Sequence, residues 1–124
     1  MAVELDEDRH PVVVLRTGEI AGDADVDALF AAFERLFEIG PVGLVIDWGR
    51  VARDARARIG EFRATNDERF VAAVRCTVSV VAAATVDANR AKAEADPHRA
   101  GRAWYASTES EAVDWVVAQL APGG

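Results

Sequence analysis

The sequence has few residues that could act as nucleophiles or metal ligands. Its 124 residues include one cysteine, Cys76, and two histidines, His10 and His98, each next to a proline. A single cysteine cannot form an internal disulfide, and we expect Cys76 to fill the core. Two isolated histidines give neither the ligand spacing of a zinc site nor a catalytic triad. We therefore predict no metal, no cofactor and no catalytic residues.

Long hydrophobic runs are also missing. The longest apolar stretch, residues 78–86, is interrupted by Ser79 and Thr85 and is much shorter than the roughly 20 residues that span a bilayer. Residues 1–8 are acidic and lack the basic and apolar segments of a signal peptide. We expect a cytoplasmic protein without a membrane span.

Positive charge is scarce and unevenly distributed. Lysine and arginine number 14 against 21 acidic residues, a net charge of −7, which argues against nucleic acid as the main partner. Residues 1–47 carry 11 acidic and 3 basic side chains, whereas residues 48–105 carry 7 acidic and 11 basic ones. Such an asymmetry can steer a partner. The alternative is a set of ordinary solvated helix faces.

Sequence motifs of common enzymes are absent. The chain contains no GxGxxG, GxxxxGKS/T or GxSxG pattern, and no nucleophile can be matched with a base. We therefore expect a protein that is not an enzyme. The length and a hydrophobic fraction of 51% suit one domain over residues 1–124.

The chain is organised around a short apolar strand at residues 44–46. Pro41 and Gly43 precede this β-branched run, and Asp47 and Gly49 close it. A run this short, bounded by residues that break regular structure, is typical of a strand buried on both faces. Because ligands and partners of such sheets meet the carboxyl ends of the strands, we look for function just after this strand.

The remaining pattern alternates strands with amphipathic helices. We expect strands at residues 3–6, 12–17, 44–48, 74–81 and 103–106, and helices at about residues 54–72, 85–95 and 109–120. Another helix is expected to follow an N-cap at Asp23 or Asp25 and to end at Gly40-Pro41. A polar turn is expected at residues 6–11, and Thr108 with Glu111 forms a capping box. Val74, Cys76 and Val78 are expected on one strand face. The predicted class is α/β, a mixed sheet of about five strands with about four helices in the order ββαβαβαβα.

Three local patterns in this order resemble the STAS or SpoIIAA-like group of small bacterial domains. The first is the opening hairpin followed by Gly18-Glu19-Ile20 and an acidic helix start. The second is the central strand ending in Val45-Ile46-Asp47. The third is the ending that runs from Trp104-Tyr105 through the capping threonine to Trp115. The resemblance spans nearly the whole chain.

The resemblance implies a non-enzymatic regulatory domain that binds another protein. In the phosphorylation-regulated members, a serine lies at the start of the helix after the central strand. Residues 54–60 of this chain contain no serine or threonine. The phosphorylation switch therefore does not carry over, and the sequence places fixed positive charge where a phosphate would add negative charge.

Arginines surround the predicted start of that helix. Their guanidinium groups are planar donors that suit carboxylates and phosphates. We therefore predict an acidic protein surface or an anion as partner there, and the alternative is a solvated arginine face paired with nearby acids. The candidate binding residues are Asp47, Trp48, Arg50, Arg53, Arg56 and Arg58. Asp47 is expected to anchor the loop by accepting backbone N–H groups, with a ligand contact as the alternative.

Two further hypotheses stay open. The lipid-carrying relatives of the group suggest a small-ligand or lipid carrier, with residues 85–95 as a lid and Phe62 and Phe70 lining a cavity. Core packing is the alternative for both phenylalanines. An exposed edge strand at residues 3–6 or an apolar helix face also offers a surface for a homodimer.

Overall fold

The computed structural model describes residues 3–97 and 102–121, which form five strands, five α-helices and one 3-10 turn. The strands are β1 (Glu4–Arg9), β2 (Val12–Ile20), β3 (Val42–Val51), β4 (Val74–Val80) and β5 (Ala103–Ala106). The helices are α1 (Asp23–Ile39), α2 (Arg53–Thr65), α3 (Asp67–Ala73), α4 (Val86–Ala95) and α5 (Glu109–Leu120), and the 3-10 turn is η1 (Ala83–Thr85).

The strands form one mixed sheet in the order β1-β2-β3-β4-β5. β1 pairs antiparallel with β2, and the other neighbours are parallel. The predicted α/β class with a five-stranded mixed sheet is thus confirmed, with five helices in place of four. β3 lies in the middle of the sheet, as the apolar run at residues 44–46 indicated.

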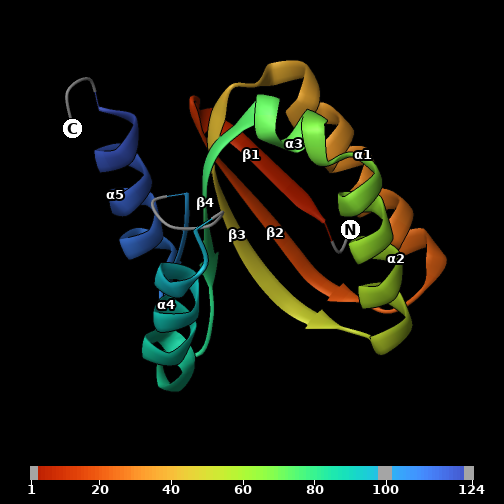
Figure 1. The fold of residues 1–124 in the computed structure, drawn as a ribbon. Helices are drawn as coiled ribbons and strands as arrows, with labels where there is room; N and C mark the ends of the chain where they lie inside the picture. Colours follow the sequence, from red (N-terminus) through yellow and green to blue (C-terminus); the bar gives the residue numbers. More distant parts are fainter. Residues whose placement is uncertain (1–2, 98–101, 122–124) are drawn as a thin grey trace.

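Helices cover the two faces of the sheet in separate groups. Figure 1 shows α1, α2 and α3 on one side of the strands, and α4 and α5 on the other. Leu44 and Ile46 belong to the core beneath α1, whereas Val45 belongs to the core beneath α5. The alternation of side chains along β3 therefore supplies both cores, and its predicted burial on both faces is confirmed.

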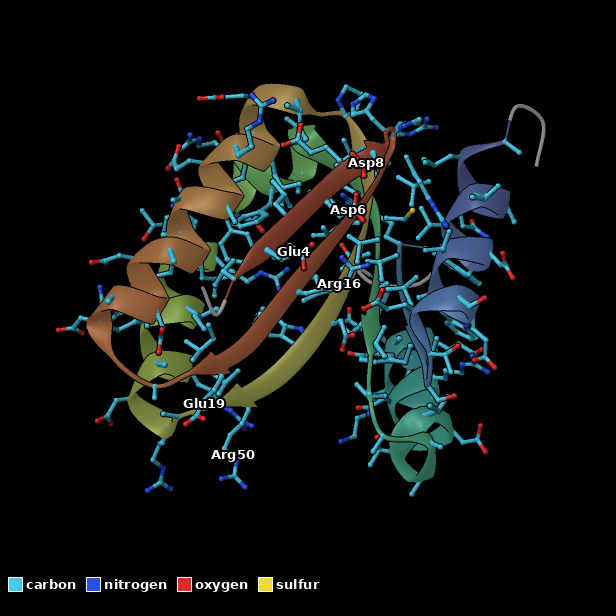
Figure 2. The ribbon with its side chains drawn as sticks, turned by 180° about the vertical axis from the view of Figure 1, so that it is seen from behind. Glu4, Asp6, Asp8, Arg16, Glu19 and Arg50 are labelled. Atoms are coloured by element: carbon cyan, nitrogen blue, oxygen red, sulfur yellow. The ribbon has the colours of Figure 1, made fainter. Side chains whose placement is uncertain are left out.

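Neither group of helices covers a whole face. The core beneath α1 draws on β2, β3 and only the first residue of β4, whereas the core beneath α5 draws on β4 and β5 as well as β2 and β3. Over most of β4 and β5, the face on the α1 side therefore lacks a helical cover within the described part of the chain. On the opposite face, β1 carries charged residues instead, including Glu4 and Asp6 (Figure 2).

The first strand is longer than predicted. We expected a turn at residues 6–11, but β1 continues to Arg9 and only His10 and Pro11 form the turn. The acidic residues remain in the strand because each face supplies them with an arginine. Asp6 pairs with Arg16 on one face, and Glu7 pairs with Arg35 of α1 at 3.0 Å on the other.

The predicted helix at residues 54–72 is two helices. Asn66 separates α2 from α3 with φ −110° and ψ 22°, and its side-chain amide donates a 2.9 Å hydrogen bond to the carbonyl of Phe62. The turn places Phe70 edge-on to Phe33 and Phe37, with ring centroids 5.1 and 4.8 Å apart. Aromatic packing against α1 therefore accompanies a break that helical periodicity alone did not reveal.

One residue of β4 faces the side opposite to the prediction. Val42 pairs with Val74, but Gly43 pairs with Cys76, so Arg75 is an extra residue on β4. Such an irregularity shifts the alternation of side chains by one position. Val74 consequently packs beneath α1, while Cys76 and Val78 pack beneath α5 as expected.

Two glycines test the local packing in opposite directions. Gly60 lies within α2 with open space around it, so Gly60→Ala should raise the free energy of unfolding by about 0.5–1 kcal/mol.

A methyl group at Gly49 would overlap the backbone of Gly18 on β2, so Gly49→Ala should lower the free energy of unfolding by about 1–3 kcal/mol. Urea unfolding measures both. A Gly49→Ala protein as stable as the wild type would contradict the close approach of β2 and β3.

Candidate functional site

The six predicted binding residues lie in different places. Asp47 and Trp48 are neighbours on β3, so their side chains point to opposite faces of the sheet. Asp47 faces Glu109 of α5, and Trp48 lines a groove on the α1 side. The structure therefore does not form one binding surface from all six residues.

Arg58 holds two helices together. Its Nη1 lies 2.8 Å from Oδ1 of Asp23, its Nη2 lies 3.7 Å from Oδ1 of Asp27, and its guanidinium group lies 5.7 Å from the ring centroid of Phe30. All three partners belong to α1. Arg58 thus connects α2 to α1 and differs from the other arginines of the region.

Arg50, Arg53 and Arg56 remain together where β3 ends and α2 begins, and we call these three residues the arginine corner. All three side chains are exposed, and none forms an ion pair with any other described residue. Arg53 and Arg56 are three residues apart on α2, which places them on one helix face. Arg50 extends away from the end of the strand, and neighbouring Glu19 does not pair with it (Figure 2).

A second group of charges lies beside the N-terminus of α5. Arg16 of β2 donates from Nε and Nη2 to both carboxylate oxygens of Glu109, at 2.9 and 2.8 Å. Its Nη1 lies 3.5 Å from the carboxylates of Glu4 and Asp6 on β1. Half of the predicted capping box of α5 is present. Thr108 accepts a 3.1 Å hydrogen bond from the backbone N–H of residue 111, but within the described residues the Glu111 side chain does not bond back to the backbone of Thr108. The role of Glu109 was not predicted.

Asp47 belongs to this group, which corrects its expected role. We predicted that Asp47 accepts backbone N–H groups, but its side chain shares a hydrogen bond with the carboxyl of Glu109. This contact and burial raise the pKa of Asp47 from 3.8 to about 6, against the opposing attraction of Arg16. The hydrogen bonds from Arg16 lower the pKa of Glu109, so Asp47 is the carboxyl of the pair that takes up a proton as the pH falls through about 6.

The raised pKa of Asp47 predicts that one substitution stabilises the protein to an extent that depends on pH. Protonated Asp47 stabilises the fold below pH 3.8, and this contribution is lost as the pH rises through about 6. Asp47→Asn stays uncharged, so it should raise the free energy of unfolding at pH 8 by about 1–2 kcal/mol and by less at pH 5. Urea unfolding at both pH values measures the difference.

Asp114→Asn is the matched control, since Asp114 is an exposed carboxylate of α5 that forms no ion pair with another described residue. This substitution should change stability by less than about 0.5 kcal/mol. An effect of Asp47→Asn that is equal at pH 5 and pH 8, or a loss of stability at pH 8, would contradict the carboxyl pair.

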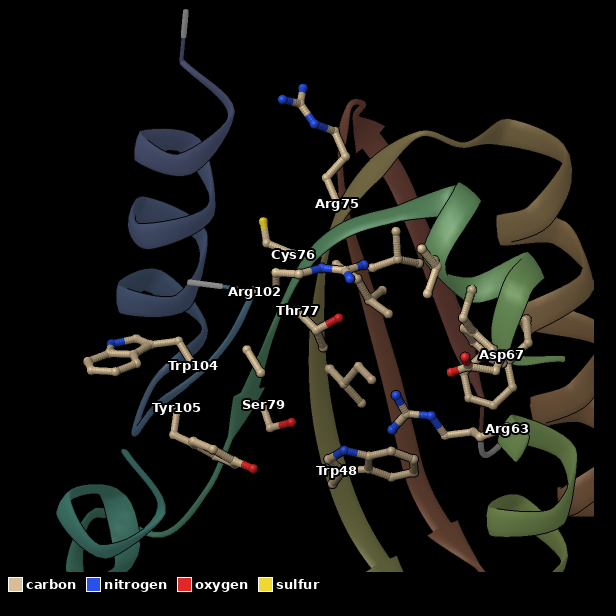
Figure 3. A pocket seen from close by; sticks show the side chains of 17 residues that line it. Trp48, Arg63, Asp67, Arg75, Cys76, Thr77, Ser79, Arg102, Trp104 and Tyr105 are labelled. Atoms are coloured by element: carbon tan, nitrogen blue, oxygen red, sulfur yellow. The ribbon is translucent and has the colours of Figure 1, made fainter. Parts of the chain in front are cut away.

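The groove on the α1 side of the sheet has a volume of about 510 Å³ (Figure 3). β3, β4 and β5 form its floor, and α2 and α3 form one wall. The floor residues are Leu44, Ile46, Trp48, Thr77, Ser79, Ala103 and Tyr105, and the wall residues are Arg63, Asp67, Phe70 and Val71. Arg102, at the start of β5, lines the other side.

The carrier hypothesis places some of these residues correctly. Phe70 lines the groove as suggested, but Phe62 stacks on Phe30 with ring centroids 4.2 Å apart and belongs to the core. The proposed lid is wrong, because no residue of α4 lines the groove. Instead, Arg90 of α4 donates a 2.8 Å hydrogen bond to the carbonyl of Tyr105 and lies over the ring of Trp104.

The sequence contained one signal for the groove that we did not use. Thr77 and Ser79 alternate with Val78 and Val80 along β4. Hydroxyl side chains on one face of a strand otherwise buried by valines indicate that this face is only partly covered. Arg63 and Arg102 could not have been placed in this way, because they reach the groove from α2 and from the start of β5.

Comparisons of this chain with family models, curated proteins and solved structures found no match. The STAS resemblance therefore stays a prediction. Among residues 3–97 and 102–121, no three His, Cys, Asp or Glu side chains come together as a potential metal site. No helix in the described ranges has both the length and the apolar character that crossing a membrane requires.

Proposed function

We propose that this chain is a non-enzymatic binding domain that contacts an acidic surface of a partner protein through the arginine corner. The observation that carries the proposal is the lack of ion pairs at Arg50, Arg53 and Arg56 within the described ranges. Other arginines of the same protein are used internally. Arg16 on β2 pairs with Glu109 on α5, and Arg58 on α2 pairs with Asp23 on α1.

The net negative charge of the chain further distinguishes the arginine corner from the rest of the surface. With 21 acidic and 14 basic residues, the protein repels an acidic partner over most of its surface. A group of three unpaired guanidinium groups then defines the orientation in which such a partner can approach. Each guanidinium can bind a carboxylate through two parallel hydrogen bonds, which suits Asp and Glu side chains on a protein surface.

The resemblance to the STAS group supports the same class of function. The matching segments include the end of the central strand, and in the phosphorylation-regulated members the regulatory serine lies at the start of the helix that follows it. In this chain the helix start has arginines in place of a phosphorylatable serine. The proposed contact is therefore constitutive and depends on ionic strength rather than on phosphorylation.

Charge reversal at the corner should slow association with the partner. A partner protein obtained by cross-linking in the native cells is purified, and its binding to the isolated chain is followed by surface plasmon resonance at several salt concentrations. Arg53→Glu combined with Arg56→Glu should reduce the association rate about tenfold and weaken its salt dependence, since charges at an interface rim act mainly on encounter.

The control double variant is Arg9→Glu with Lys92→Glu, which makes the same change in net charge. Arg9 lies at the opposite end of the sheet from the corner, and Lys92 lies on α4. Both side chains are exposed, and neither forms an ion pair with another described residue. This control should reduce association much less. Equal losses in the two double variants, or no loss in either, would refute the arginine corner as the contact.

A further inference from the structure

The two incompletely covered regions of the sheet differ in how their polar groups are satisfied. The hollow beside β1 has a volume of about 240 Å³ and is lined by Asp6, Arg16 and Glu109, whose charges pair with one another, and by Arg9, which has no ion pair with another described residue. The groove on the α1 side is about twice as large and contains cations and hydroxyls without such partners. We infer that this groove binds a small organic carboxylate with an apolar body.

The size and the floor of the groove suit an apolar body. Its volume of about 510 Å³ falls within the roughly 300–1,000 Å³ of small-molecule sites. Leu44, Ile46 and Trp48 line the β3 side, and Phe70 lines the wall from α3. Aromatic and aliphatic side chains on two sides of a groove bind an apolar group through area removed from water.

Three arginines line the groove, and two of them give it its charge, because the side chain of Arg75 points away from it (Figure 3). Arg63 from α2 and Arg102 from the start of β5 extend into it from opposite sides (Figure 3). Neither forms an ion pair within the described ranges, and Arg63 instead lies 5.5 Å from the ring centroid of Phe70. Asp67 is the only acidic residue that lines the groove. In a protein of net charge −7, this is a local excess of positive charge that favours an anion.

Hydroxyl groups on the floor provide further donors. Thr77 and Ser79 are half-buried and point into the groove, and no described group forms a hydrogen bond with either hydroxyl (Figure 3). The buried hydroxyl of Thr17 is different, because it donates to the carbonyl of Gly18 and accepts from the N–H of Gly49. The β4 hydroxyls are therefore available to a carboxylate that the two arginines attract.

The inference does not depend on the proposed protein contact. None of Arg50, Arg53 and Arg56 lines the groove. Ligand binding should therefore persist in the Arg53→Glu/Arg56→Glu variant, and failure of either proposal leaves the other intact.

Three small molecules and one spectroscopic signal test the site. The probes are 1-naphthoate, the neutral 1-naphthalenemethanol and the fatty acid decanoate, each titrated into ¹⁵N-labelled protein. Trp48 and Trp104 both line the groove, whereas Trp115 of α5 does not and stacks on Trp104 with ring centroids 6.1 Å apart. Naphthoate should shift the indole N–H signal of Trp48, assigned through Trp48→Phe, and leave that of Trp115 unchanged.

Charge selectivity provides the second criterion. Naphthoate should bind at least tenfold more tightly than the neutral alcohol, and Arg63→Gln with Arg102→Gln should remove that preference. Arg9→Gln, at an exposed arginine outside the groove, should retain it. An unchanged Trp115 signal in each variant verifies the fold.

Four outcomes would overturn the inference. These are no binding of naphthoate at millimolar concentration, equal binding of the alcohol, binding of decanoate alone, and a shift of Trp115 in place of Trp48.

Discussion

The fold depends on burying both faces of β3. Leu44 and Ile46 project to one side and Val45 to the other, and all three are at most 5% exposed. Water must therefore be excluded from both faces at the centre of the sheet, and removing this apolar area from water is the main driving force. Helices that meet over β3 from opposite sides satisfy this requirement without covering the edges of the sheet.

The uncovered edges follow from this arrangement and differ in chemistry. Beside β1, Arg16 pairs with two carboxylates of β1 and with one of α5, so these charges are balanced within the protein itself. Beside β4 and β5, the floor consists of small hydroxyl residues and aromatic rings, and arginines enter from the sides. The charges at one edge thus pair within the protein, and the other edge forms the groove for which we infer a ligand.

The sequence predicted the features that arise from local periodicity. Three such features depend on neighbours in the chain, and the structure contains all of them. They are the strand at residues 44–48, the apolar face of helix α1 and the N-cap at Thr108. It could not predict that Arg58 binds α1 while Arg56 does not, because the choice depends on where Asp23 lies in space. The extra residue Arg75 on β4 is likewise set by pairing with β3.

The position of the candidate ligand site escaped prediction for a similar reason. The strand pattern around Asp47 and Trp48 correctly drew attention to the end of β3, but the two side chains serve opposite faces. Which face is open depends on how far α3 and α5 extend over the sheet. That distance is a property of tertiary packing, which no window of sequence contains.

The partial cover of β4 is tested most directly by thiol reactivity at two positions of the same strand. Native Cys76 borders the groove but is only 4% exposed, because it packs in the core beneath α5, and burial raises the pKa of its thiol. Ser79 is only half-buried and faces the groove. Folded wild-type protein should react slowly with Ellman's reagent, and Ser79→Cys should add one rapidly reacting thiol. Slow reaction of both thiols would show that the groove is closed, and rapid reaction of Cys76 would show that α5 does not cover β4.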